Sequence, residues 1–194
     1  LAAHLVPGRD LLAFPLGLTA EAPALETTAG FGLWNAASVA IPSGSRLRMA
    51  VGTMSAPVDV AVSAQLATVA ARLGDGTTVG LSVVSASVAD LIRTESDPQS
   101  IGDEIPYSTT LLSALAAREF GVVTVGAALR LRTGHADSER RSAVSVDVGA
   151  TTRGLGRRDV RVAASTFLAS PSGRRRERMA VLAAVDLRLA GLDS

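Results

Sequence analysis

The sequence predicts an all-β protein: an antiparallel up-and-down meander of about eight long strands behind a short irregular or helical N-terminal segment. The first observation is an alternation of apolar with small or polar residues, which recurs in nearly every stretch after residue 45. The second is a set of glycine-, aspartate- and serine-rich turn signals between these stretches. Together they divide the chain into a lead-in or plug segment, residues 1–45, and a region of strands, residues 46–194.

The N-terminal segment differs from the rest because proline interrupts it repeatedly. Prolines stand at positions 7, 15, 23 and 42. The small residues of ALETTAGFGLWNAASVA, between the last two prolines, are compatible with a short helix. Long strands are therefore expected only from Arg46 onward.

In the first strands the aliphatic residues occupy every second position. RLRMAVGTM places Leu47, Met49 and Val51 on one face. VDVAVSAQL sets alternate valines against Asp59 and its polar neighbours, and TTVGLSV continues the pattern. Near Val84 the alternation shifts by one residue, which predicts a β-bulge at that position.

The later strands repeat this alternation. It is present in VVTVGAALRLRTG, RRSAVSVDVGATTRG, RDVRVAASTFLAS and ERMAVLAAVDLRLAG. Residues 111–117 are apolar on both faces and by themselves would also fit a helix. Turns are indicated by GDG at 74–76, GHADSERR at 134–141, GLGRR at 154–158 and SPSGRRR at 170–176, and the longest polar loop covers 93–106.

The composition excludes several classes of protein. Hydrophobic residues make up 47% and the mean hydropathy is +0.32, yet no uncharged apolar stretch reaches the roughly 18 residues of a transmembrane helix. The net charge is +1, aromatic residues make up 3%, and the arginines are scattered apart from the run at 174–178, so no nucleic-acid partner is expected. The lack of cysteine excludes disulfides, cysteine-based zinc sites and thiol catalysis, and it is compatible with an extracytoplasmic compartment.

Charged residues stand in the middle of the predicted strands, on the face opposite the aliphatic one. In a soluble β-sandwich or lid, which is the alternative interpretation, that face would meet solvent. The strands are long, however, and the charged face is otherwise rich in glycine, alanine and serine, which favours the confined interior of a transmembrane β-barrel with its aliphatic face in lipid. The residues predicted to face the lumen are Arg46, Arg48, Asp59, Arg130, Arg132, Asp147, Arg161, Asp186 and Arg188.

A family resemblance supports the barrel interpretation. GFGLWNAASVA at 30–40 resembles the WNPAGLA-type element that closes the N-terminal segment in PorV-like proteins, relatives of the FadL-like outer-membrane fatty-acid transporters. The stretch 78–134 is similar to that family's succession of strand, polar loop and paired strands, and the resemblance covers about residues 28–170. It implies an outer-membrane barrel in which Trp34 and Asn35 anchor the N-terminal segment.

The chain departs from this family in three ways. Ala36 stands where the family has proline after Trp-Asn. Aromatic residues for the two membrane interfaces are nearly absent, since the chain has one Trp, one Tyr and four Phe. Family members resemble one another in having about fourteen strands and a final aromatic residue, whereas this chain offers about eight. We therefore expect either a small barrel or, preferably, the N-terminal part of a longer one.

No enzyme signature is present, and we expect no cofactor and no bound metal. His4 and His135 are far apart in the sequence, and ADSER beside His135 crowds serine, histidine and acid into one loop, where a catalytic triad is improbable. GDG is a hairpin turn because no lysine and no helix follow it. The acidic loop with Glu95, Asp97, Asp103 and Glu104 lacks the spacing and glycine of an EF-hand calcium loop.

Two functions are expected, one from each interpretation. The resemblance implies a protein in the outer membrane of a Gram-negative-type bacterium, with the lipid bilayer as its partner. Its role would be transport of hydrophobic molecules, or support of protein export and surface attachment with a protein partner. The alternative is a soluble or periplasmic all-β structural or interaction module, whose aliphatic face is an ordinary core or a partner interface.

Overall fold

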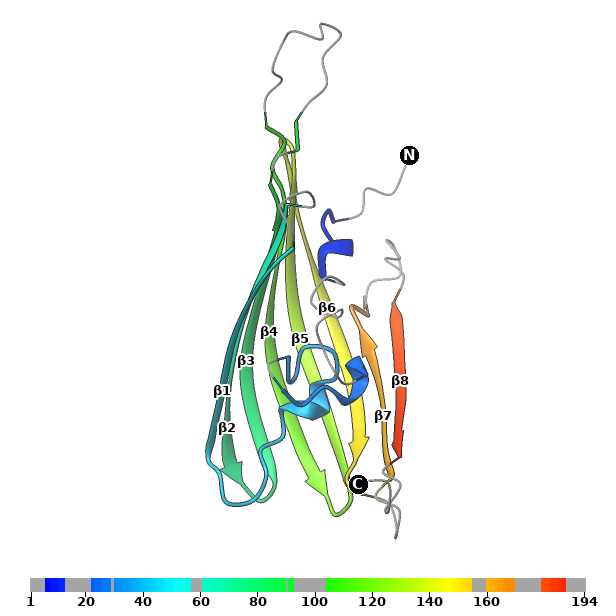
Figure 1. Cartoon of the computed structure of the whole chain (residues 1–194). Helices are drawn as coiled ribbons and strands as arrows, with labels where there is room; N and C mark the ends of the chain where they lie inside the picture. The colour runs from blue at the N-terminus through cyan, green and yellow to red at the C-terminus, as the bar shows by residue number, and fades with distance from the viewer. Residues whose placement is uncertain are drawn as a thin grey trace, which may run out of the picture.

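The computed structural model describes residues 6–12, 22–28, 30–56, 61–89, 91–92, 104–154, 160–169 and 179–187. Eight antiparallel strands form one sheet in sequence order, and the sheet curls into a half-barrel (Figure 1). The predicted all-β meander is therefore confirmed. The strands are β1 (Leu47–Ser55), β2 (Val62–Gly74), β3 (Thr77–Val88), β4 (Tyr107–Phe120), β5 (Val123–Ala136), β6 (Glu139–Thr152), β7 (Val160–Phe167) and β8 (Ala180–Leu187).

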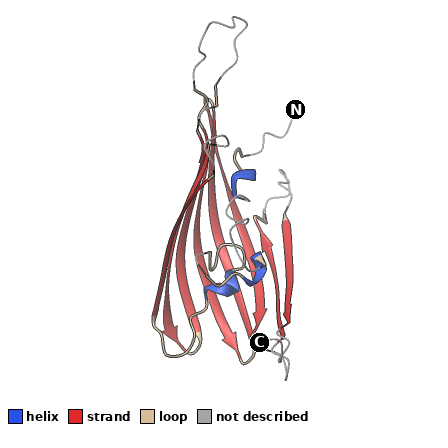
Figure 2. Ribbon diagram, viewed as in Figure 1, coloured by secondary structure: helices blue, strands red, loops and turns tan. Residues whose placement is uncertain are grey.

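Within the described residues, helical structure is confined to short turns of the N-terminal segment (Figure 2). They include the 3-10 helices η2 (Pro23–Leu25) and η3 (Ala36–Val39). Residues 111–117, for which a helix was also compatible, form the middle of β4. None of the helices in the described residues has the length and apolar character needed to cross a membrane.

Tight hairpins join the central strands. At the β2–β3 turn Asp75 has φ 45° and Gly76 has φ 72°, which is the left-handed pair that a type I′ turn requires. The GDG turn prediction is confirmed. β5 and β6 pair along their whole length, from Val123 opposite Thr152 to Ala136 opposite Glu139.

The predicted β-bulge near Val84 is wrong. β2 and β3 pair without interruption from Val62 opposite Val88 to Arg72 opposite Thr78, and the register shifts only at the turn. The apolar residues instead change faces along straight strands: Leu81 is 56% exposed on the convex face, whereas Val84 is 1% exposed on the concave face. The apolar residues change faces because the concave face around Val84 and Ala86 is covered by Leu11 and Leu12 of the N-terminal segment.

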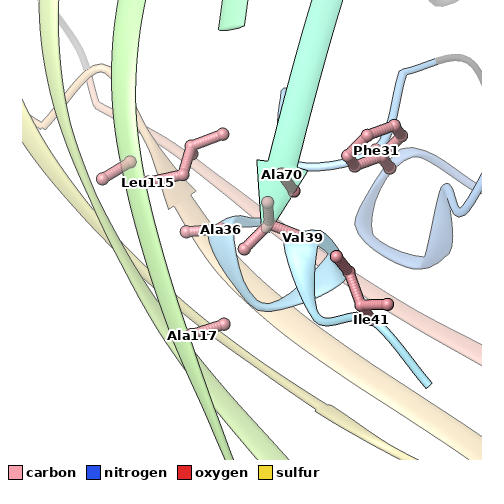
Figure 3. Packing of buried hydrophobic residues seen from close by; sticks show 8 residues of the cluster. Phe31, Ala36, Val39, Ile41, Ala70, Leu115 and Ala117 are labelled. Atoms are coloured by element: carbon pink, nitrogen blue, oxygen red, sulfur yellow. The ribbon is translucent and has the colours of Figure 1, made fainter. Parts of the chain in front are cut away.

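The N-terminal segment lies in the hollow of the sheet and forms the core with it (Figure 1). One cluster joins Leu12, Leu33 and Trp34 to strand residues that include Val84 and Leu111. A second cluster lies nearer the end of the sheet that carries the β2–β3 and β4–β5 turns, and Figure 3 shows it. There Phe31, Ala36, Val39 and Ile41 of the segment face Ala70, Leu115 and Ala117 of the strands, whose concave side we call the wall. The concave face thus forms an interface with the N-terminal segment.

The last hairpin is attached to the sheet by a short junction. β6 and β7 pair only from Gly149 opposite Ser165 to Thr151 opposite Ala163. β7 ends at Phe167, where Leu168 takes a left-handed conformation with φ 57°. Beyond the end of β7, the residues that follow it take its place beside β6: the N–H of Val146 donates a hydrogen bond to the carbonyl of Ala169 at 3.0 Å.

Candidate functional site

The candidate functional site is the part of the concave face that binds the N-terminal segment, which we call the seat. Three glycines on this face allow the close approach of the segment. A Cβ atom at Gly126 would overlap the backbone of Ala36 and Ala37, and one at Gly134 would overlap the backbone of Pro7. A Cβ atom at Gly149 would overlap the side-chain oxygen of Asn35 in the same way. The wall therefore touches the segment at three points where only glycine fits.

Arginine side chains of the wall bind main-chain carbonyls of the segment. Arg132 donates from Nη1 to the carbonyls of Val6 and Pro7, both at 3.0 Å. Arg130 reaches the carbonyl of Gly32 at 3.4 Å. Irregular segments leave many carbonyls without partners in secondary structure, and each buried one needs a donor. These arginines supply donors where the segment has no strand neighbour.

Two further arginines do the same on the β1–β2 side. Arg72 donates to the carbonyl of Ile41. Arg48 donates to the carbonyl of Thr28 at 3.4 Å, and its guanidinium lies 4.0 Å from the centre of the Phe31 ring. The wall arginines thus hold the segment from both sides of the half-barrel.

A buried ion pair lies at the centre of the seat. Arg130 Nε and Asp147 Oδ2 are 2.6 Å apart, and the two side chains are 0% and 1% exposed. Ser113 accepts a second hydrogen bond from Arg130 at 3.0 Å, and Asp147 Oδ1 accepts the backbone N–H of Ala169 at 2.9 Å. A buried ion pair needs such additional partners because desolvation of both charges is costly. Asp147 therefore links the wall to the loop that ends β7.

Asn35 connects three separate parts of the chain. Its side-chain oxygen accepts the N–H of Ala37 at 3.0 Å and so caps η3. Its amide donates to the carbonyl of Ala24 at 2.8 Å and to that of Ala150 in β6 at 3.2 Å. An Asn at the N-cap position is favoured because it satisfies an amide that the helix leaves free.

Trp34, 3% exposed, packs beside Asn35 on the aromatic residue of β7. The ring centres of Trp34 and Phe167 are 4.8 Å apart at an angle of 50°. The carbonyl of Trp34 accepts a hydrogen bond from Ser165 at 2.9 Å. Trp34 and Asn35, which the resemblance singled out, thus contact β7 and β6 respectively.

The other predicted lumen-facing residues lie at different depths. Arg161 and Asp186 pair across β7 and β8 at 2.6 Å, with side chains 22% and 34% exposed. Arg46 precedes β1 and is exposed. Asp59 and Arg188 lie outside the described residues, as do His4 and most of the acidic loop. The structure therefore brings Arg130, Arg132 and Asp147 together at the seat, with Arg48 near its edge.

The sequence interpretation missed the glycine contacts and the hydrogen bonds of Tyr107 to the N-terminal segment. Gly126 and Gly134 share the alternation of Arg130 and Arg132, so small residues in phase with mid-strand arginines were a signal for a close-packed segment. Tyr107, whose hydroxyl donates to Asp10 at 2.8 Å and accepts the N–H of Gly8 at 3.2 Å, gave no such signal. The partners come from residues about one hundred positions apart.

The convex face carries an apolar band around all eight strands. Its members are aliphatic, alternate with concave residues, and are between 37% and 80% exposed: Leu47, Met49, Val51, Leu73, Leu81, Leu112, Val125, Leu129, Leu131, Val144, Val146, Val148, Val162, Val181 and Val185. Two shallow apolar hollows, of about 390 and 230 Å³, lie in it and share Leu81 and Ala114 as lining residues. This band has no partner among the described residues.

A polar belt borders the band at the end of the sheet where β3 ends and β4 begins. Hydroxyl groups pair across neighbouring strands there, Ser63 with Ser87 at 3.2 Å, Ser85 with Thr110 at 3.4 Å and Thr133 with Ser142 at 3.0 Å. The convex face thus changes from aliphatic to polar along β2 to β6. The belt consists of Thr53, Ser63, Gln65, Ser85, Ser87, Thr110, Thr133 and Ser142.

No protein-family model, curated protein or solved structure matches this chain. Within the described ranges, no three His, Asp or Glu side chains gather where they could hold a metal ion. The geometry of the molecule itself therefore indicates its chemistry. Two features define it: a concave seat that binds the N-terminal segment and a convex band of exposed aliphatic side chains.

Proposed function

We propose that this protein is an outer-membrane β-barrel protein whose N-terminal segment forms a plug on the inner wall. The convex band would lie in the hydrocarbon of the bilayer, and the concave seat would face the lumen. Its role, as the resemblance to PorV-like and FadL-like proteins suggests, is the passage of hydrophobic molecules or the support of protein export and surface attachment.

The exposed aliphatic band is the observation that carries this proposal. Monomeric soluble proteins rarely expose contiguous apolar surface of more than a few hundred Å², and here the band crosses every strand of the sheet. From Val123 to Leu131 the outward face of β5 is apolar over about 27 Å of strand, at ~3.4 Å per residue. With the usual tilt of ~40° this covers about 20 Å of membrane normal, near the ~25 Å of known barrels.

The free edges of the half-barrel add a requirement. Among the described strands, β1 and β8 each have only one neighbour in the sheet. Backbone groups left unpaired in lipid cost several kcal/mol each, so spanning sheets are closed. The proposal therefore includes further strands that pair with β1 and β8, from the same polypeptide or from a second copy.

Single-cysteine labelling tests the membrane position, because the chain has no native cysteine. Leu129→Cys places a thiol in the band and Ser85→Cys places one in the polar belt, both on the convex face. In intact membranes a charged maleimide is expected to label Ser85→Cys and to leave Leu129→Cys unlabelled until the protein is boiled in SDS. Ala128→Cys, next to Leu129 but 2% exposed on the concave face, is the control for thiols protected by protein.

Equal labelling of Leu129→Cys and Ser85→Cys in the native protein would overturn the membrane proposal. Mobility in SDS gels gives an independent check, since a closed barrel migrates differently before and after boiling. The apparent mass of the unheated protein on the gel also distinguishes a barrel closed by a longer polypeptide from a barrel closed by a second copy.

A second candidate, the soluble or periplasmic module, is favoured by the placement of the aromatic residues. Membrane barrels carry aromatic girdles on their outer surface. Here Phe31, Trp34 and Phe167 are 0%, 3% and 6% exposed in the interior, and Phe120, 58% exposed at the end of β4, is the outward aromatic among the described residues. In this case a protein partner would cover the band, and the protein would be recovered without detergent.

A further inference from the structure

A hollow of about 440 Å³ opens on the concave face at the end of the sheet that carries the β4–β5 turn. The N-terminal segment forms one side of it through Ala37, Ala40 and Pro42. The other side is formed by the start of β5, the end of β6 and the start of β7. Arg48 of β1 also lines the hollow. The plug and wall described above therefore do not fill the concave face completely.

The residues that line this hollow include arginines and hydroxyl-bearing side chains, while most of the exposed lining surface is apolar. Three arginines line it, Arg48, Arg153 and Arg161, and among the described lining residues none is Asp or Glu. The acidic neighbours, Glu26 of Arg48, Glu119 of Arg153 and Asp186 of Arg161, are not among the lining residues. The hydroxyl groups of the lining belong to Thr27, Ser38, Thr124, Thr151 and Thr152.

Arg48 and Arg153 each have more N–H donors than they use in contacts with the described residues. A guanidinium has five N–H groups. Arg48 makes one hydrogen bond to the carbonyl of Thr28, lies over the Phe31 ring and is attracted by the charge of Glu26. Arg153 contacts Glu119 through Nη2 alone. Positioned arginines and hydroxyls are the groups that bind carboxylate and phosphate oxygens.

We propose that this hollow is a binding site for an oxyanion, a carboxylate or phosphate group carried by a small molecule. Arg48 and Arg153 bind the charged oxygens, and Thr124 and Thr151 complete the hydrogen bonding. Ala40 and Pro42 offer an apolar surface for the remainder of the ligand. This site does not depend on the membrane proposal, because it is built from concave residues only.

Calorimetric titration of the purified full chain tests the site with two probes, inorganic phosphate and hexyl phosphate. Arg48→Gln is expected to weaken binding by about tenfold or more, since a charge-assisted hydrogen bond contributes roughly 1.5–3 kcal/mol. Thr151→Val removes one hydroxyl with little change in shape and is expected to weaken binding about threefold to tenfold. Arg141→Gln is the matched control, because Arg141 pairs with Glu139 at the opposite end of β6.

The pattern of results decides both the site and the source of the anion. Binding of inorganic phosphate indicates a free anion, and binding of hexyl phosphate alone indicates the head of an amphipathic molecule. If neither probe binds at millimolar concentration, or if Thr151→Val and Arg48→Gln bind as tightly as Arg141→Gln, the proposal is wrong. Circular dichroism identifies a variant that has not folded, in which case Thr151→Val alone decides. The cysteine labelling pattern stays the same in either case, so the two proposals fail separately.

Discussion

The β4–β6 wall and the β7–β8 hairpin each contain an arginine–aspartate pair, but the two pairs lie in different surroundings. Arg130 and Asp147 are 0% and 1% exposed under the N-terminal segment. Arg161 and Asp186 are 22% and 34% exposed on strands of eight residues. In both regions the charges alternate with aliphatic residues in the same way.

The difference shows that the segment, rather than the strand pattern, decides what a mid-strand charge does. In the wall the segment removes water, so Arg130 also binds Ser113 and the Gly32 carbonyl, and Asp147 also binds Ala169. In the hairpin water reaches the pair and screens it. Four substitutions test this contrast, from the largest expected effect to the smallest.

Asp147→Asn is expected to have the largest effect. It leaves Arg130 as a buried charge without its counter-ion, and breaking a buried pair typically costs about 3–5 kcal/mol. Urea unfolding followed by circular dichroism measures the loss. A change below about 1 kcal/mol would show that water reaches the pair and would remove the contrast between the two regions.

Gly126→Ala comes second, because the added methyl group overlaps the backbone of Ala36 and Ala37. Overpacking of this kind costs about 1–3 kcal/mol, and the segment is expected to move away from the wall. The fluorescence of Trp34, the chain's one tryptophan, reports this movement. Ala127→Val is the control: it enlarges the adjacent, outward residue and should leave the fluorescence unchanged.

Asn35→Ala is expected to have a smaller effect of about 1–2 kcal/mol, the usual cost of losing an N-cap and its hydrogen bonds. The segment should detach at lower urea concentration than the sheet unfolds, so Trp34 fluorescence should change before the circular dichroism signal. Coincident transitions would mean that Asn35 supports the segment and the wall as one unit.

Asp186→Asn completes the series with an expected loss of about 0–1 kcal/mol, because the pair it breaks is partly exposed. High salt should reduce this small loss further while leaving the cost of Asp147→Asn nearly unchanged. A cost equal to that of Asp147→Asn would show that the hairpin is covered in the native assembly, for example by the strands that the membrane proposal requires.

Much of the fold follows from the sequence alone. Alternation of apolar and small residues has a period of two only in strands, and turn residues such as Asp75 and Gly76 mark where the strands reverse. The all-β meander, its eight strands and the irregular character of the N-terminal segment could therefore be predicted. The pairing of Arg130 with Asp147 could only be anticipated in outline, as charges sharing one face.

The tertiary structure decided which face of each strand is covered. The apolar residues of β3 change from the convex to the concave face between Val83 and Val84 without a bulge, because Leu11 and Leu12 cover the concave side there. The glycine contacts and the carbonyls bound by Arg132 likewise depend on a segment about ninety or more residues away in the sequence. Alternation is a local property of the backbone, whereas burial depends on what else the chain brings to each face.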